Sequence, residues 1–149
     1  MKVVVATDGS AAAIDGAHQA IELLRPGAEI ILATVILEWQ DPMESAGGFE
    51  GPLGTEKEAD EDYAKRVAAG NDALVHTTEA VGAEVEVKLI PAGENPGPAI
   101  VHLAEQLDAD VIVIGAEGKS ALRRFFRGSV SDHVVHHAPC PVLVIRHHD

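Results

Sequence analysis

The chain has 149 residues, the usual size of one domain, and carries 24 acidic residues against 11 lysines and arginines, for a formal net charge of −13. This charge disfavours general nucleic-acid binding outside a local basic patch. Hydrophobic residues make up 46% of the chain and aromatic residues only 3%, so we expect a core of Val, Ile, Leu and Ala. No apolar run approaches the ~18 residues that span a bilayer, and the N-terminus lacks the pattern of a signal peptide. We expect residues 1–149 to form one cytoplasmic domain with no membrane partner.

The first half of the chain predicts two strands and two helices. In chain order they are a strand at residues 2–7, a helix from Ser10 to Pro26, a strand at residues 28–37 and a helix at residues 56–81. The first strand is an apolar run rich in β-branched residues, as a strand buried on both faces is. Residues 38–55 are rich in glycine and proline and predict a loop. The acidic start of the second helix suits the positive end of the helix dipole.

The second half continues the alternation of strands and helices. It predicts a strand at residues 84–90, a helix at 96–107, a strand at 110–114, a helix at 129–137 and a strand at 141–146. The alternation predicts a Rossmann-like α/β fold, with a five-stranded parallel sheet covered by helices on both faces. Ligands of such sheets bind beyond the carboxyl ends of the strands, where the winding direction reverses. We therefore expect the functional residues just after the apolar strands.

A glycine pair, Gly115 and Gly118, follows the fourth predicted strand. It is not a Walker phosphate loop, because the glycine which that loop requires upstream is replaced by Val113. Alone, the pair fits a tight turn as well as a ligand loop. After a further nine residues, Gly128 and Ser129 begin the next helix, whose free amides and hydroxyl can bind an anion.

The segment between these glycines is basic and contains no acidic residue after Gly118. Its basic residues are Lys119, Arg123, Arg124 and Arg127. In a chain of charge −13 this is a local positive site that attracts phosphate, with a solvated basic turn as the alternative.

Together these motifs resemble the universal stress protein family. Its nucleotide-binding members carry a Gly-x2-Gly-x9-Gly-Ser/Thr signature, matched here by Gly115, Gly118, Gly128 and Ser129. Residues 5–10 (Val-Ala-Thr-Asp-Gly-Ser) and the segment 130–144 also look like that family. The resemblance covers nearly the whole chain. It implies an ATP-binding regulatory or stress-response protein, with Mg²⁺ accompanying the nucleotide.

The resemblance also implies where the nucleotide lies: adenine and ribose near the first two strands, and the triphosphate at the glycine signature. The implied contacts are Ala6, Thr7, Asp8, Val35, Gly115, Ala116, Gly118, Lys119, Ser120, Gly128, Ser129 and Val130. Asp8 can accept hydrogen bonds from ribose hydroxyls, or it can cap the first helix. Glycine at 115, 118 and 128 lets backbone amides approach phosphate oxygens. Glu117 stands where many relatives have histidine, and its carboxylate opposes the phosphate charge unless it points outward or holds magnesium.

No histidine or carboxylate is placed as an activating base, so we expect a binding protein without catalytic residues. A slow ATPase or phosphotransferase is one alternative, and a dimeric module that binds no nucleotide is another. The histidines at 133, 136 and 137 have helical spacing, and a surface or dimer-facing cluster is favoured over a metal site. Cys140 has no partner for an internal disulfide and is interpreted as a small buried residue.

The last predicted strand, Pro141–Arg146, is strongly apolar. At a sheet edge such a strand seeks pairing, and in the family it commonly pairs across a two-fold axis. We therefore expect a homodimer formed through this strand.

Overall fold

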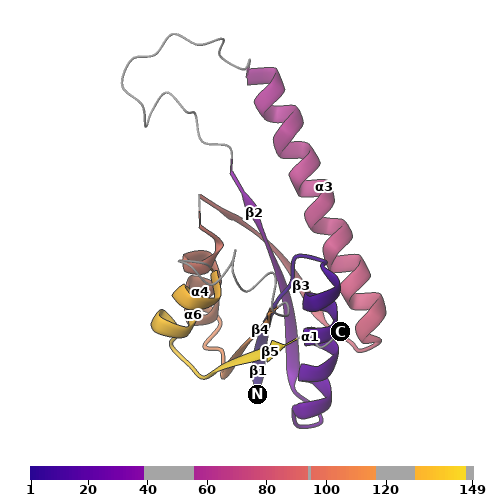
Figure 1. The fold of residues 1–149 in the computed structure, drawn as a ribbon, viewed down its shortest axis with the longest axis vertical. Helices are drawn as coiled ribbons and strands as arrows, with labels where there is room; N and C mark the ends of the chain where they lie inside the picture. The colour runs from indigo at the N-terminus through magenta and orange to yellow at the C-terminus, as the bar shows by residue number, and fades with distance from the viewer. Residues whose placement is uncertain (39–55, 94, 117–129, 147–149) are drawn as a thin grey trace.

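A computed structural model describes residues 1–38, 56–93, 95–116 and 130–146, in which strands and helices alternate along the chain (Figure 1). The elements are β1 (Lys2–Ala6), α1 (Ala11–Leu23), β2 (Glu29–Leu37), α3 (Glu56–Val81), β3 (Glu86–Ala92), α4 (Pro96–Gln106), β4 (Val111–Ala116), α6 (Val130–His137) and β5 (Val142–Arg146). All nine elements lie where the sequence predicts them, with ends that differ by at most a few residues. The predicted loop at 38–55 lies outside the described residues, except for Glu38.

The sheet has five strands in the order β3-β2-β1-β4-β5, and all neighbouring strands are parallel. The chain winds outward from β1 to β2 and β3, and then returns to place β4 on the other side of β1. The winding direction therefore reverses between β1 and β4, and their carboxyl ends form the switch point of the sheet. This confirms the predicted Rossmann-like α/β fold.

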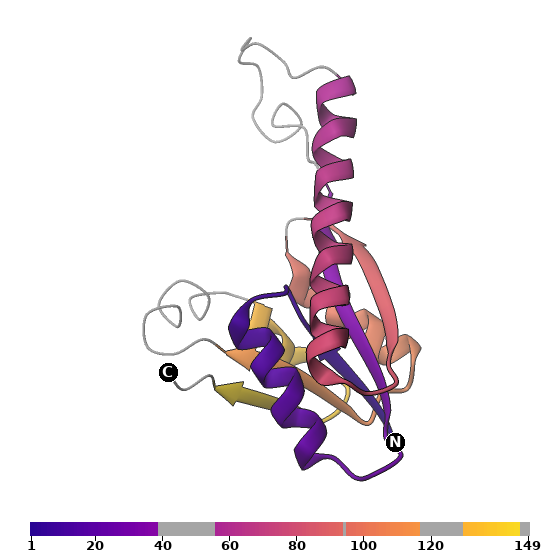
Figure 2. The same cartoon turned by 90° about the vertical axis from the view of Figure 1, so that its right-hand side faces the viewer.

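Helices cover both faces of the sheet, with α1 and α3 on one face and α4 and α6 on the other (Figures 1 and 2). Alternate residues of β1 enter different cores: Val4 packs beneath α4 and α6, whereas Val3 and Val5 pack beneath α1 and α3. All three side chains are at most 1% exposed. This burial on both faces explains why the central strands are uninterrupted apolar runs in the sequence.

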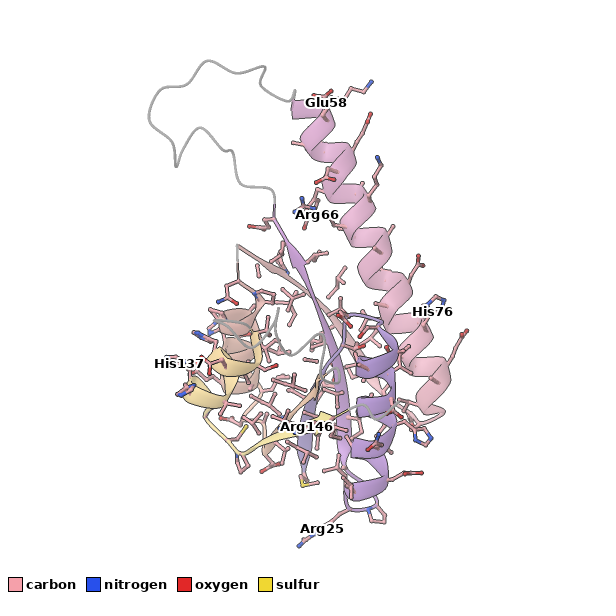
Figure 3. All side chains as sticks on the ribbon, in the orientation of Figure 1. Arg25, Glu58, Arg66, His76, His137 and Arg146 are labelled. Atoms are coloured by element: carbon pink, nitrogen blue, oxygen red, sulfur yellow. The ribbon has the colours of Figure 1, made fainter. Side chains whose placement is uncertain are left out.

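Helix α3 has 26 residues, about 39 Å at the usual helical rise, and its first half projects past the sheet (Figure 2). Glu58 lies near the projecting end, and Arg66 lies where the helix passes β2 (Figure 3). The Arg66 guanidinium donates to the Leu37 carbonyl oxygen at 2.9 Å and pairs with Asp62 at 2.7 Å. These contacts attach the middle of α3 to the carboxyl end of β2. Within the described segments, none of the helices is long and apolar enough to cross a membrane.

Candidate functional site

The site begins at Thr7, the first residue after β1, whose polar atoms are all bonded inside the protein. Its amide donates to the Ala33 carbonyl at 2.9 Å, and its own carbonyl accepts from the Thr34 hydroxyl at 2.7 Å. Its hydroxyl lies 2.9 Å from that of Thr77 and accepts from the Gly9 amide at 3.2 Å. The Thr7 side chain is only 6% exposed. The structure thus shows Thr7 holding the loop in place, and its direct contact with a nucleotide stays a prediction.

Asp8 and Ser10 follow in a turn that leads into α1. The Asp8 carboxylate accepts from the Ser10 amide at 2.9 Å, and the Ser10 hydroxyl accepts from the Ala13 amide at 3.2 Å. Ser10 is therefore the cap of α1, which resolves the alternative that the sequence leaves open for Asp8. The Asp8 side chain is exposed just beyond the carboxyl end of β1, so it is available to a ligand at the switch point.

Gly115, near the end of β4, lies against the first turn of α1. A Cβ placed on Gly115 would lie 2.8 Å from the Ala12 carbonyl oxygen and 2.9 Å from Ala13 Cα. From the other side, a Cβ on Gly16 would lie 3.0 Å from Gly115 Cα. The missing side chain at 115 thus allows a strand and a helix to approach closely, which is a packing reason that the sequence interpretation in terms of phosphate did not include.

Three predicted nucleotide contacts, two for adenine and ribose and one for the triphosphate, come together on the face covered by α4 and α6. Ala6, Val35 and Val130 are partly buried and pack against the same hydrophobic core. Ala6 pairs with Ile114 in the sheet, beside the strand that carries the first glycine of the signature. Ala116 is the last residue of β4. The structure therefore gathers Ala6, Asp8, Val35, Gly115, Ala116 and Val130 at or near one end of the sheet.

The rest of the predicted phosphate site lies outside the described residues. These are Gly118, Lys119, Ser120, Gly128 and Ser129, together with Glu117 and the basic residues Arg123, Arg124 and Arg127. Their direct contacts with a nucleotide stay predictions. The two ends of this segment are described, since it leaves β4 after Ala116 and rejoins the fold at Val130, the first residue of α6.

The histidines of α6 form a surface cluster, at which Figure 3 labels His137. The rings of His133 and His137 stack with centroids 4.1 Å apart. His133 also packs closely against Gly97 of α4, since a Cβ added to Gly97 would lie 2.9 Å from the His133 Cβ. Nδ1 of His136 and of His137 each donates to the carbonyl four residues earlier at 2.8 Å. Across the described ranges, no group of three or more His, Cys, Asp or Glu side chains could hold a metal ion.

Cys140 is half-buried and packs against the core beneath α4 and α6. Burial raises the pKa of the Cys140 thiol above its ordinary value, and the nearby Asp110 carboxylate raises that pKa further. Both effects keep the thiol protonated and poorly nucleophilic. This environment agrees with the interpretation of Cys140 as a small packing residue.

The hydroxyls of Thr34 and Thr77 are functional features that sequence reasoning missed. Both side chains are at most 5% exposed, and both bond to Thr7. Their signal in the sequence is weak, because each is a single threonine at a buried position of an otherwise apolar pattern. The partner of such a hydroxyl is decided by tertiary packing.

The sheet order, with its switch point between β1 and β4, places the protein among the doubly wound α/β proteins, and sequence comparison identifies the family within this class. Residues 1–146 match the model of the universal stress protein family. A universal stress protein of Methanocaldococcus jannaschii is 31% identical over 150 residues, which cover 97% of this chain and 81% of that protein. The chain belongs to the universal stress protein family.

Solved structures with the same fold include members of that family. A universal stress protein from Lactobacillus plantarum matches with a TM-score of 0.73 and 24% identity, covering 98% of this chain and 97% of that one. One from Archaeoglobus fulgidus, in complex with dAMP, matches with a TM-score of 0.60 and 26% identity, covering 97% of both chains. One from Arabidopsis thaliana, with AMP bound, has a TM-score of 0.66 and 18% identity, covering 99% of this chain and 92% of that one.

Proposed function

We propose that the protein binds ATP beyond the carboxyl ends of β1 and β4 and acts as a nucleotide-dependent regulatory module in the cytoplasmic stress response. One observation carries the proposal: the glycine signature begins at the end of β4, which lies beside β1 at the switch point of the sheet. Ligands of doubly wound sheets bind at this place. The dAMP and AMP complexes of structurally similar family members support an adenine nucleotide as the ligand.

In this proposal one set of residues binds the adenine and ribose, and a second set binds the phosphates. The exposed Asp8 carboxylate accepts hydrogen bonds from ribose hydroxyls, and the apolar side chains of Ala6 and Val35 border the adenine. The amides at Gly118 and Gly128, with the Ser129 hydroxyl, meet the phosphates at the start of α6. Lys119 and the arginines that follow it supply positive charge in a chain of net charge −13.

Magnesium would arrive bound to the phosphate oxygens. Over the segments that the structure covers, there is no cluster of three or more side chains able to ligate it. Mg²⁺ usually keeps several waters and is held by substrate phosphates with only one or two carboxylates. The proposed complex is therefore ATP with Mg²⁺, and no residue is assigned a catalytic role.

Two variants of the signature test the site by calorimetric titration with ATP and Mg²⁺. Gly128→Val puts a branched side chain where phosphate approaches the helix, and it should abolish binding. Ser129→Ala removes one hydrogen bond worth ~1–3 kcal/mol when the acceptor is charged, and it should weaken binding. Wild-type affinity in a folded Gly128→Val protein would refute the site. Turnover of ~1 per second or faster would favour an enzyme instead.

We also propose that the protein is a homodimer paired through β5. This strand lies at one edge of the sheet, and Val142, Leu143 and Val144 are all partly exposed there. An uncovered apolar edge strand favours pairing with another chain. Sedimentation at micromolar concentration and moderate salt should give the mass of two chains. A monomer under these conditions would overturn this proposal without affecting the nucleotide site.

A further inference from the structure

Helix α3, although distant in the sequence, packs against the loop that follows β1. A Cβ placed on Gly9 would lie 2.8 Å from Ala73 Cβ and 2.9 Å from Ala73 Cα, so the loop backbone rests directly on this helix. Gly9 also has a φ of +76°, a conformation that side chains rarely adopt. Both constraints bear on the same residue, which lies between Asp8 and the Ser10 cap of α1.

One turn further along α3, Thr77 completes a directed chain of hydrogen bonds to the same loop. The Thr77 hydroxyl lies 2.7 Å from the Ala73 carbonyl oxygen, which can only accept, so Thr77 donates its single hydroxyl proton there. The Thr77 oxygen must then accept from the Thr7 hydroxyl, 2.9 Å away. The Thr7 oxygen in turn accepts from the Gly9 amide at 3.2 Å. The chain runs from Gly9 through Thr7 and Thr77 to Ala73.

This chain is shielded from water, because Thr77 is 0% exposed and Thr7 is 6% exposed. A buried hydroxyl left without a hydrogen-bond partner destabilises the folded state by its desolvation free energy. The arrangement therefore favours the one loop conformation in which all these hydroxyls are bonded. The neighbouring Thr78 provides a contrast. Its hydroxyl makes the same bond to the carbonyl four residues earlier, that of Leu74 at 2.7 Å, and this bond stays within α3.

We infer that α3 sets the shape of the nucleotide loop, with Thr77 and Ala73 as positioning residues that hold Asp8 in place for the ribose. Neither residue touches the nucleotide in this scheme, and both act through Thr7 and Gly9. The ligand in this inference rests on the proposed function, whereas the coupling of α3 to the loop rests on the hydrogen-bond chain alone.

The matched pair Thr77→Val and Thr78→Val separates positioning from general helix stability. Each removes one hydroxyl that bonds within α3, but only the first removes a hydroxyl bonded to Thr7. ATP titration should give roughly two- to tenfold weaker binding for Thr77→Val, the size expected for one neutral hydrogen bond. Thr78→Val should stay within about twofold of wild type. Thr77→Ser keeps the hydroxyl and should restore the affinity.

Amide exchange of the nucleotide-free protein, followed by NMR, tests the same inference without a ligand. The Gly9 amide should exchange faster in Thr77→Val than in wild type or Thr78→Val. A second pair, Ala73→Gly and its control Ala69→Gly, replaces an interior alanine of α3 in both cases, and only the first removes the methyl that supports Gly9. This pair keeps the test open if Thr77→Val does not fold.

The outcomes are distinguishable. Faster Gly9 exchange in Thr77→Val and Ala73→Gly, with weaker ATP binding, supports the inference. Unchanged exchange and unchanged affinity in both variants overturns it. A wild-type protein that binds no ATP overturns the proposed function, while the exchange of Gly9 still decides whether α3 positions the loop.

Discussion

Replacing Gly115 by alanine tests the contact between β4 and α1 that brings the glycine signature next to the loop after β1. The new Cβ would lie 2.8 Å from the Ala12 carbonyl oxygen and 2.9 Å from Ala13 Cα. Both are backbone atoms, so the methyl group fits only if the helix moves. Overpacking of this kind costs about 1–3 kcal/mol, and the preference for alanine over glycine in a strand returns about 0.5–1 kcal/mol. The midpoints of these two ranges differ by about 1 kcal/mol, so we expect Gly115→Ala to lower the free energy of unfolding by about 1 kcal/mol.

Gly70→Ala in α3 is the matched control for urea unfolding followed by circular dichroism. Its Cβ would lie 2.7 Å from Leu89 Cδ1, the flexible end of a side chain that can turn away. Alanine is also favoured over glycine in a helix interior by about 1 kcal/mol, so this variant should be as stable as wild type or slightly more stable. A Gly115→Ala protein as stable as wild type would refute the reasoning. An equal loss of unfolding free energy in both variants would show that a steric contact with backbone atoms costs no more here than one with a flexible side chain.

Three further predictions concern a helix cap, a thiol and a sheet edge. Ser10→Ala should lower the free energy of unfolding by about 1 kcal/mol, because it removes the acceptor for the Ala13 amide, while Ser10→Asp should retain it; equal urea midpoints for the two variants would contradict this. Since burial raises the pKa of Cys140, its folded state keeps the thiol proton longer than the unfolded state does, so its stabilising contribution is intact at neutral pH and is lost as the pH rises through the raised pKa. The difference in unfolding free energy between wild type and Cys140→Ala should therefore fall in alkaline buffer, and a rising difference would be inconsistent with it. Val144→Lys should convert the dimer to a monomer in sedimentation, whereas Val87→Lys on the opposite edge strand should leave the dimer intact; dissociation by both would exclude β5 as the specific interface.

The sequence predicted the fold well because the central strands and the helices differ so clearly in period. Residues 3–6 and 111–114 are uninterrupted apolar runs, as strands buried on both faces require. The prediction for the third strand was less accurate: it ended at residue 90, whereas β3 is Glu86–Ala92. Pro91 made the pattern look finished, but β3 is an edge strand, where a proline can be accommodated without the loss of a central ladder bond.

The candidate site was predicted only in part, because its supporting contacts join residues that are far apart in the sequence. Thr7 and Thr77 are 70 positions apart, and neither residue alone reveals that their hydroxyls meet. Gly115 was assigned to phosphate approach on the basis of spacing, and the structure shows that it also has to admit the backbone of α1. A motif thus identifies a residue without distinguishing the two roles that a missing side chain can have.

The position of the nucleotide is the central claim, and an NMR titration of the uniformly ¹⁵N-labelled protein with ATP and Mg²⁺ tests it most directly. We predict saturable shifts concentrated at the carboxyl ends of β1 and β4, in residues 7–10 and 115–116, and at Val130 where α6 begins. Amides at the opposite end of the sheet, such as those of Glu29 and Asp110, should keep their positions. Shifts centred on that opposite end, or no shifts at millimolar ATP, would contradict the account.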